Sequence, residues 1–454
     1  MHELRNIKVG YAPLKQPYFD QKWANEIHER SLKLLRGLGG VTLIEPNGTI
    51  TTEEDAWKAA RVFHREDVDL VLIQCINADS GILTSAIGPN SDAPILVWST
   101  PEPTMHETSL VANSFCGAMI ITSTLRRHNV KYKHLQGFPE DKRFKESLEK
   151  AIKVLGSISV LRESKLGLVG YQSPGFHHVS FDEMLLRRTF GVSVQHIDLS
   201  EVFAEAQELT KETVAKEINE IEKEGTRTRS VVEEDFQKTA CVSLSMKRLA
   251  QKYRIDALAV KCFPEFNELF KLAPCAAMAR VTDSRTMAAC EGDMIGALTM
   301  LVEYYLTENP VFFVDLISLD EKTNTGIVWH CGNAPICMVE GPREARYEQH
   351  SILAQATPMG LTREFACKPG SVTCARISEL EDGYCIYAIG GEAVKGDATL
   401  RGTSMTIRFH QPAEEIGKTL FEEGVENHFA VVYGDIRDQL EDLSKWLGIE
   451  CVVL

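Results

Sequence analysis

The spacing of apolar residues in the first part of the chain predicts strands that alternate with helices. Apolar runs of strand length are followed by segments in which apolar residues recur at helical intervals. The predicted strands are residues 7–11, 41–44, 68–74 and 94–98, and the predicted helices are residues 19–38, 53–64, 109–127 and 142–155. Strands that are joined through helices run parallel, so residues 1–162 are predicted to form a doubly wound, Rossmann-like α/β domain.

A second alternation of the same kind follows and predicts a second doubly wound α/β domain over residues 163–308. Its predicted strands are residues 165–170, 192–197 and 257–260, and its predicted helices are the highly charged segment 202–224 and the amphipathic segment 293–306.

The pattern changes after Pro310, where short apolar runs are separated by Gly and Pro turns. These runs are residues 311–314, 326–329, 371–377, 384–389 and 404–409. Such spacing is typical of antiparallel sheets and barrels, so residues 309–454 are predicted to be a β-rich, barrel-like domain. A short helix at residues 436–446 and a final apolar run at residues 451–454 complete the prediction.

Composition and charge narrow the class of protein. The chain has 454 residues, of which 44% are apolar and 25% charged, a profile of folded soluble proteins. Its net charge of −15 argues against nucleic acid and anionic membranes as partners. The N-terminus lacks a basic segment followed by an apolar one, and no run of about 18 apolar residues occurs, so we expect a cytoplasmic protein.

Sequence motifs for nucleotides and for metal–sulfur chemistry are missing. The chain contains neither GxGxxG nor GxxxxGK[ST], so NAD and ATP are not expected. Its twelve cysteines are scattered and form no CxxC pair, which favours free, buried thiols over disulfides or an iron–sulfur cluster.

Two acids flank a glycine just before the predicted helix 293–306. Asp293 is interpreted as a helix cap, because a carboxylate at a helix start accepts hydrogen bonds from free backbone N–H groups. Glu291 follows a small apolar run, residues 287–290, so its carboxylate is expected at a buried edge, where it needs a partner such as a metal. Asp315 ends the apolar run 311–314, and it either marks the strand's exit into solvent or belongs to a site.

Two histidines are further candidates. His428 stands immediately before the apolar run 429–432, and His330 ends another predicted strand. Each position suits a ligand, although a structural histidine is the commoner case. Together, Glu291, Asp315 and His428 supply hard oxygen ligands and one imidazole, a set that suits Mn²⁺ or a similar octahedral ion better than structural zinc.

These residues resemble the metal site of the L-fucose isomerase/L-arabinose isomerase superfamily, whose domain plan also agrees with the prediction. In that family a first carboxylate lies in an acid-rich turn before a helix, and a second lies 24 residues later at the end of an apolar strand. The step from Glu291 to Asp315 is also 24 residues. The third ligand is a histidine in a turn similar to Gly424–His428. Residues 110–117 and the Pro-Gly-Phe turn at residues 174–176 are similar to the family as well.

The resemblance implies a metal-dependent aldose–ketose isomerase that moves a proton between C1 and C2 of a free sugar through an enediolate. Glu291 and Asp315 would be catalytic and, with His428, would hold Mn²⁺ or another divalent cation. The sugar would be of the L-fucose or D-arabinose type, or an anionic hexose such as sulfoquinovose. The resemblance also implies a homotrimer or homohexamer, in which the first domain of a neighbour closes the pocket; Trp98 and His106 are candidates for that contact.

Three residues are candidates for binding the sugar: Lys261, His330 and Asn333. Lys261 follows a buried strand, in a region that contacts the sugar in related enzymes, although a solvated lysine at a strand end is the alternative. If Lys261 faces the pocket together with Arg408, an anionic sugar is favoured.

Two alternatives to an isomerase stay open. Two α/β domains are also typical of non-catalytic sugar-binding proteins. The same three ligands could serve another metal-dependent carbohydrate enzyme, such as an aldolase or a hydrolase.

Overall fold

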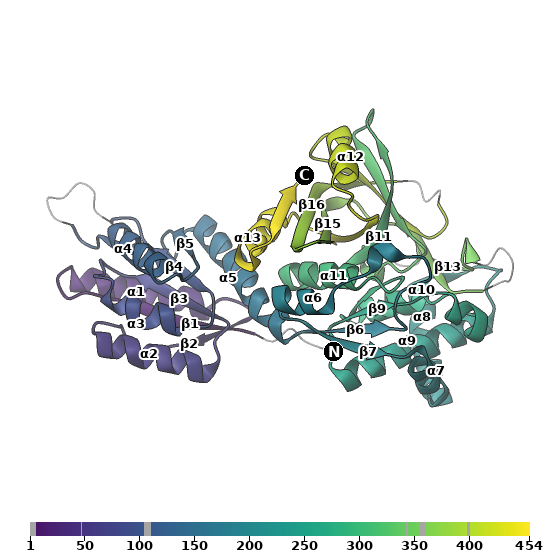
Figure 1. Cartoon of the computed structure of the whole chain (residues 1–454), viewed down its shortest axis with the longest axis horizontal. Coiled ribbons are helices and arrows are strands. Elements are labelled where there is room, and N and C mark those ends of the chain that lie inside the picture. Colours follow the sequence, from purple (N-terminus) through teal and green to yellow (C-terminus); the bar gives the residue numbers. More distant parts are fainter. Residues whose placement is uncertain (1–5, 47, 104–109, 342–343, 354–358, 397–399) are drawn as a thin grey trace. The chain divides into compact units, whose positions relative to one another are not determined.

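The computed structural model describes residues 6–46, 48–103, 110–341, 344–353, 359–396 and 400–454. The chain divides into two compact units, Glu3–Val160 and Leu161–Leu454, which Figure 1 shows as ribbons. None of the helices described is both long and apolar enough to cross a lipid bilayer.

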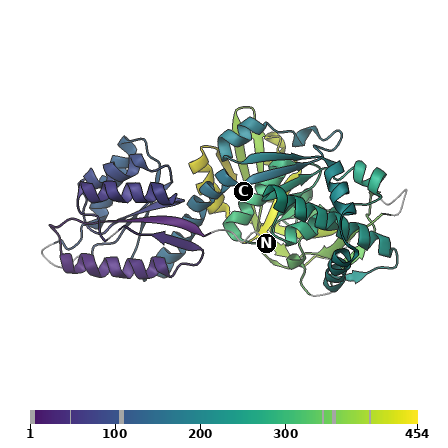
Figure 2. The same ribbon diagram turned by 90° about the horizontal axis from the view of Figure 1, so that it is seen from below.

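The first unit is a five-stranded parallel sheet with helices on both faces (Figure 2). The strand order is β2-β1-β3-β4-β5. The strands are β1 Ile7–Leu14, β2 Val41–Ile44, β3 Leu70–Cys75, β4 Ile95–Ser99 and β5 Tyr132–Gln136, and the helices are α1 Gln21–Arg36, α2 Glu53–Glu66, α3 Ile82–Ile87, the 3-10 turn Gly88–Asn90, α4 Ser114–Arg127 and α5 Lys142–Glu163. The predicted doubly wound α/β fold is confirmed for this unit, although β5 and α3 were not predicted.

Local signals explain where these elements begin and end. Strands β3 and β4 are buried along their whole length, as expected for central strands covered on both faces. Helix α1 begins after Asp20, whose carboxylate accepts a hydrogen bond from the backbone N–H of Trp23 at 2.9 Å. Helix α4 begins at Ser114 rather than at residue 109, because Asn113 has a left-handed backbone with φ of 52°.

The second unit contains a four-stranded parallel sheet in the order β10-β9-β6-β7. Its strands are β6 Lys165–Val169, β7 Ser193–Ile197, β9 Ala257–Val260 and β10 Met287–Ala289, and its helices are the 3-10 turn His177–Val179, α6 Glu183–Phe190, α7 Leu199–Gln207, α8 Lys211–Glu224, α9 Glu233–Tyr253, the π-helical turn Phe266–Phe270, α10 Cys275–Asp283 and α11 Met294–Thr307. The second α/β layer is therefore confirmed.

The prediction of one continuous helix over residues 202–224 is wrong. The chain forms two helices, α7 and α8, and the second begins where the hydroxyl of Thr210 accepts a hydrogen bond from the backbone N–H of Thr213. A threonine at this position satisfies an N–H that a continuous helix would bond internally, so it favours a new helix start.

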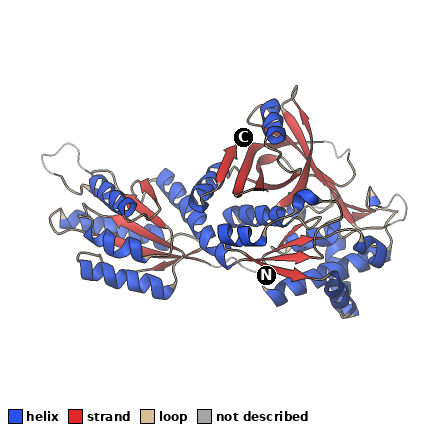
Figure 3. Ribbon diagram, in the orientation of Figure 1, coloured by secondary structure: helices blue, strands red, loops and turns tan. Residues whose placement is uncertain are grey.

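The C-terminal part of the second unit is a closed, six-stranded antiparallel barrel, which confirms the predicted β-rich domain. Neighbouring strands follow the cycle β11-β12-β17-β16-β15-β18 and back to β11. The barrel strands are β11 Phe312–Asp320, β12 Thr325–His330, β15 Gly370–Leu380, β16 Gly383–Val394, β17 Thr403–Phe409 and β18 His428–Tyr433; the added strands are β8 Thr226–Arg227, β13 Arg346–Glu348, β14 Thr362–Ala366 and β19 Glu450–Val453, with the 3-10 turn Ile336–Met338 and helices α12 Ala413–Glu422 and α13 Arg437–Leu447. Figure 3 shows these strands in red.

Helix α11 joins the parallel sheet to the barrel. It contacts β6, β9 and β10 of the sheet and β11, β15 and β18 of the barrel. All of its residues except the last are buried, which explains why its sequence is apolar on every side. The parallel sheet and the barrel therefore form one compact unit, and the domain boundary predicted between residues 308 and 309 stays a prediction.

A buried charge cluster holds helices α8, α9 and α10 together. Glu217 on α8 accepts hydrogen bonds from Lys247 Nζ at 2.8 Å and Arg280 Nε at 3.0 Å, and also from the hydroxyl of Ser243 at 2.9 Å. Burial alone would raise the pKa of Glu217, but Arg280 and Lys247 outweigh burial and lower its pKa to about 2. The ionised form of Glu217 therefore stabilises the folded state.

We expect Glu217→Gln to lower the free energy of unfolding by about 3–5 kcal/mol near pH 7, because two buried cations lose their shared partner. Since the pKa of Glu217 is lowered on folding, its contribution is complete above its ordinary pKa of 4.5 and is lost as the pH falls toward about 2. Urea unfolding at several pH values checks this: the difference between variant and wild type should shrink toward pH 2. Glu212→Gln, on the exposed face of α8, is the control and should change stability by less than about 1 kcal/mol. An equal effect of both substitutions would contradict the prediction.

Candidate functional site

Glu291 lies in a tight turn between strand β10 and helix α11. Its backbone is left-handed, with φ of 59°, and Gly292 follows with φ of 76°. A side chain at Gly292 would collide with the backbone oxygen of Tyr171, so only glycine fits there. The turn places Glu291 at the C-terminal end of the parallel sheet, the end at which open α/β sheets form their sites.

Asp315 and His428 lie opposite each other on neighbouring antiparallel barrel strands, β11 and β18. Residues that are paired in this way share one face of the sheet. Asp315 Oδ1 is 3.6 Å from His428 Nε2, and Glu291 Oε2 is 2.9 Å from the same nitrogen. The structure therefore brings together the three residues that the sequence nominated as metal ligands.

The other ring nitrogen of His428 faces Asp293. Nδ1 of His428 is 2.9 Å from Asp293 Oδ2, and the same carboxylate oxygen accepts a hydrogen bond from Arg376 Nη1 at 2.6 Å. Because Nδ1 has to donate to this carboxylate, the lone pair of neutral His428 lies on Nε2, on the side of Glu291 and Asp315. The chain thus fixes both the tautomer and the direction of the imidazole.

Asp293 also has the capping role that the sequence predicts. Its Oδ1 accepts a hydrogen bond from the backbone N–H of Gly296 at 2.7 Å, in the first turn of α11. The contacts with His428 and Arg376 were missed, because those residues lie 135 and 83 positions further along the chain. Arg376 also forms an ion pair with Glu426, in which Nη2 of Arg376 lies 3.3 Å from Oε1 of Glu426.

The ionisation of the cluster follows from its burial and its charges. Burial alone would lower the pKa of His428, but Asp293 and Glu291 outweigh burial and raise it to about 9. Burial alone would also raise the pKa of Glu291, but the hydrogen bond with His428 and the nearby His330 lower it. Burial raises the pKa of Asp315. Among the described residues, the imidazole of His428 therefore balances part of the negative charge of Asp293 and Glu291.

The donor atoms fit a divalent cation. Oε2 of Glu291 is buried, and the imidazole nitrogens beside it are Nε2 of His428 at 2.9 Å and Nε2 of His330 at 3.9 Å. Asp293 is paired with Arg376, whereas Glu291 and Asp315 lie beside imidazoles, and the amide of Asn427 donates to Asp315 Oδ1 at 2.6 Å. Two carboxylates and one imidazole nitrogen suit an octahedral ion such as Mn²⁺ that keeps positions open for other oxygens.

His330 carries an unused polar atom beside this cluster, and Asn333, three positions further along the chain, has a buried amide. Nδ1 of His330 accepts a hydrogen bond from the backbone N–H of Cys331 at 2.8 Å, so its proton is on Nε2, which lies 3.9 Å from Glu291 Oε2. That Nε2 and both amide atoms of Asn333 are buried without a hydrogen-bond partner among the described residues. Buried groups of this kind are available to bind the hydroxyls of a ligand.

Lys261 lies at the same end of the parallel sheet as Glu291. Its backbone N–H bonds to the carbonyl of Val169, the last residue of β6. Its ammonium is mostly buried and donates to Glu265 at 2.6 Å, so it is not the solvated lysine of the alternative interpretation. Arg408 is exposed and pairs with Thr325, at the opposite end of β12 from His330, so we do not place it at the site.

Three further residues contact the cluster. Arg376 was not predicted as a site residue, although its charge interrupts the apolar residues of strand β15 and so indicates a buried polar partner. Asn427, which donates a hydrogen bond to Asp315, was not predicted as a site residue. The ring of His178 lies 5.6 Å from that of His428, so one member of the His177–His178 pair reaches the cluster.

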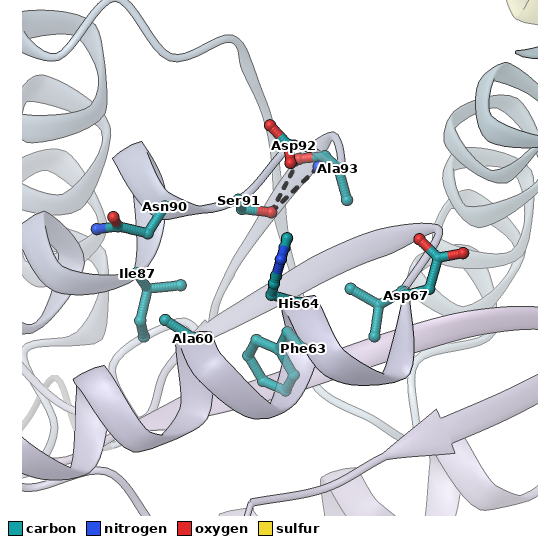
Figure 4. Close-up of a pocket in the computed structure, with 10 residues that line it drawn as sticks. Ala60, Phe63, His64, Asp67, Ile87, Asn90, Ser91, Asp92 and Ala93 are labelled. Atoms are coloured by element: carbon teal, nitrogen blue, oxygen red, sulfur yellow. Dashed lines mark hydrogen bonds between the residues drawn. The ribbon is translucent and has the colours of Figure 1, made fainter.

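Two cavities outside the cluster are lined by none of the residues predicted for the site. One of about 100 Å³ lies between α2 and the segment 87–93 of the first unit, where Figure 4 shows His64 beside Ser91. The other, of about 630 Å³, lies in the second unit between β13, β14 and residues 395–396 and 400–402. Trp98 is buried in the first unit, with its indole N–H bonded to the carbonyl of Gly137, so the prediction of a subunit contact there is not supported. His106 lies outside the described residues.

Comparison with known proteins identifies the family. Residues 10–162 match the fucose/sulfoquinovose isomerase N-terminal domain, and residues 328–454 match the L-fucose isomerase C-terminal domain. The chain belongs to the L-fucose isomerase-like superfamily. As a member of this superfamily it is an isomerase, an aldose–ketose isomerase in the class of intramolecular oxidoreductases.

Full-length relatives of this fucose isomerase-like chain are named sulfoquinovose isomerase. The protein of Priestia megaterium is 29% identical over 451 residues, which cover 99% of this chain and 100% of the relative. The protein of Clostridium sp. is 27% identical over 457 residues, and that of Alkalicoccus urumqiensis is 26% identical over 447 residues. The superfamily is generally metal-dependent, in keeping with the donor set around His428.

Proposed function

We propose that the protein is a divalent-cation-dependent sulfoquinovose isomerase, and that Glu291, Asp315 and His428 hold the cation. The observation that carries the proposal is the convergence of both carboxylates on one imidazole nitrogen, within 2.9 and 3.6 Å. The substrate is suggested by the full-length relatives, which carry that name. Mn²⁺ is the cation that the oxygen-rich donor set favours.

Isomerisation requires that a weakly acidic C–H proton moves between C1 and C2 of the open-chain sugar. A bound divalent cation would polarise the carbonyl and make the neighbouring C–H proton more acidic. Glu291 and Asp315 are the carboxylates at hand to remove this proton from one carbon and to assist its return to the other. Asn427 holds Asp315 in place, and the pair Asp293 and Arg376 holds His428.

The buried groups next to the carboxylates would orient the sugar. Nε2–H of His330 is a donor for a sugar oxygen, and the amide of Asn333 offers one donor and one acceptor. Lys261 is the cation that we propose for the sulfonate, since its ammonium lies at the same end of the sheet as Glu291. Glu265 would then hold this ammonium between two anionic groups. A homo-oligomer, the predicted trimer or hexamer, and a cytoplasmic location stay predictions.

Proton NMR in D₂O tests the proposal with the purified full-length chain, Mn²⁺ and three sugars: sulfoquinovose, L-fucose and D-arabinose. We expect sulfoquinovose to be converted to its ketose with deuterium entering at C1 of the ketose and, through the reverse reaction, at C2 of the aldose. The conversion should be at least about tenfold faster than that of either neutral sugar, since a neutral sugar offers no anion to the buried ammonium of Lys261 and such a loss costs more than about 1.4 kcal/mol. A protein that only binds sugar would exchange no hydrogen. Products with a broken C–C bond would instead indicate an aldolase, and faster conversion of a neutral sugar would reject the substrate.

A further inference from the structure

A pair of buried thiols lies directly behind the carboxylate of Glu291. Cys262 follows strand β9 and Cys290 follows strand β10, two neighbouring parallel strands. One ligand atom from each of Cys262, Cys290 and Glu291 lies within 4.8 Å of the other two. The two cysteines are 6% and 1% exposed. Neither thiol belongs to the set of oxygen and nitrogen donors around His428.

We infer that Cys262, Cys290 and Glu291 form a second cation site, selective for thiol-seeking divalent ions such as Zn²⁺ and Cd²⁺, and that its occupation inhibits the enzyme. Thiolate ligands select such ions over Mn²⁺ and Mg²⁺. In a tetrahedral site with metal–sulfur bonds of about 2.3 Å the ligand atoms lie about 3.8 Å apart, which the cluster reaches with small side-chain rotations. Water would complete the coordination.

Binding at this site involves proton release and no redox step. Each thiol loses its proton to solvent as its metal–sulfur bond forms.

The inhibition rests on the proposed function, because Glu291 would be shared between the two sites. Oε2 of Glu291 is 2.9 Å from Nε2 of His428. A carboxylate oxygen of Glu291 also lies within 4.8 Å of the ligand atoms of Cys262 and Cys290. A cation bound to the thiolates would use the same carboxylate charge that the catalytic cation needs. A cation on the thiols therefore withdraws Glu291 from the catalytic cluster, and excess Mn²⁺ should restore it.

Titration of the metal-free, full-length protein with Cd²⁺ tests the site without any need for activity. Cadmium bound to thiolates absorbs in the ultraviolet, whereas Mn²⁺ gives no such band. We expect one such Cd²⁺ per chain in the wild type. In Cys262→Ala and Cys290→Ala the affinity should fall at least about 100-fold, since loss of an outer-shell partner alone costs about 10–100-fold. Cys374→Ala, which removes a buried thiol of barrel strand β15, is the control and should behave as the wild type.

The Cd²⁺ titration tests the second cation site, and the isomerase assay tests the proposed function, so a negative result in one does not decide the other. An unchanged absorption and affinity in folded Cys262→Ala would overturn the second site, whether or not the protein is an isomerase. With activity established, micromolar Zn²⁺ at fixed Mn²⁺ should inhibit the wild type at least tenfold more strongly than Cys262→Ala. Equal inhibition of both proteins, or inhibition that excess Mn²⁺ does not relieve, would overturn the coupling through Glu291.

Discussion

Glu291→Gln is expected to reduce isomerase turnover by at least about 10³-fold and to weaken Mn²⁺ binding, because one side chain is proposed to serve as metal ligand and as proton-transfer group. A positioned acid or base alone contributes about 10²–10⁴-fold. The substitution keeps the size of the side chain but removes one of the two negative charges near Nε2 of His428. The neutral amide oxygen is also a poorer ligand for a hard cation.

Initial rates over a range of Mn²⁺ concentrations, together with direct Mn²⁺ binding, measure this effect. Glu303→Gln is a closely matched control, because Glu303 is also a buried glutamate, on the adjoining helix α11. Neither of its carboxyl oxygens has a hydrogen-bond partner among the described residues, and burial raises the pKa of Glu303 well above its usual value. Because burial favours the neutral form of this carboxyl, the amide should replace it with little change in activity. Near-normal turnover of Glu291→Gln would refute the proposed cation site.

The sequence was sufficient to predict the elements that carry the strongest apolar patterns. The central strands, the barrel strands and helix α11 all follow from runs of buried residues or from helical spacing. Helix α9, Glu233–Tyr253, was missed because its buried face consists largely of Ala, Ser and Thr, which give weak contrast with the exposed face. Helices α7 and α8 were predicted as one helix, because both are rich in charged residues and the cap at Thr210 is the local signal that separates them.

The site was predictable to the extent that its residues interrupt apolar runs. Glu291 and Asp315 stand out because each follows a run of apolar residues, and the 24-residue step between them matched the family. What the sequence cannot display is the pairing of distant residues. Asp293 satisfies a local rule as a helix cap, and this role concealed its bond to His428. Lys261 is the opposite case, because its partner Glu265 lies only four positions further on and could have been predicted.

Asp293→Asn is expected to raise the Mn²⁺ concentration needed for half-maximal activity by about 10–100-fold, the usual effect of losing a carboxylate that orients a metal-bound histidine. Asparagine can still cap α11 and can still accept a hydrogen bond from His428. It no longer carries the charge that opposes Arg376 and favours a proton on Nδ1. The imidazole therefore loses its preference for the tautomer whose free nitrogen faces Glu291 and Asp315.

Activity as a function of Mn²⁺ separates this positioning role from the role of Glu291. Saturating Mn²⁺ should return Asp293→Asn to within about tenfold of the wild-type turnover, because both carboxylates of the cluster remain, whereas Glu291→Gln should stay inactive at any Mn²⁺ concentration. Asp182→Asn is the control for the capping function, since Asp182 caps α6 with bonds from Met184 and Leu185 at 2.8 and 3.0 Å. If Asp293 acted only as a cap, the two variants would show the same Mn²⁺ dependence and differ from the wild type only in thermal stability. A specific loss of Mn²⁺ affinity in Asp293→Asn would instead show that the helix cap also directs the imidazole of His428.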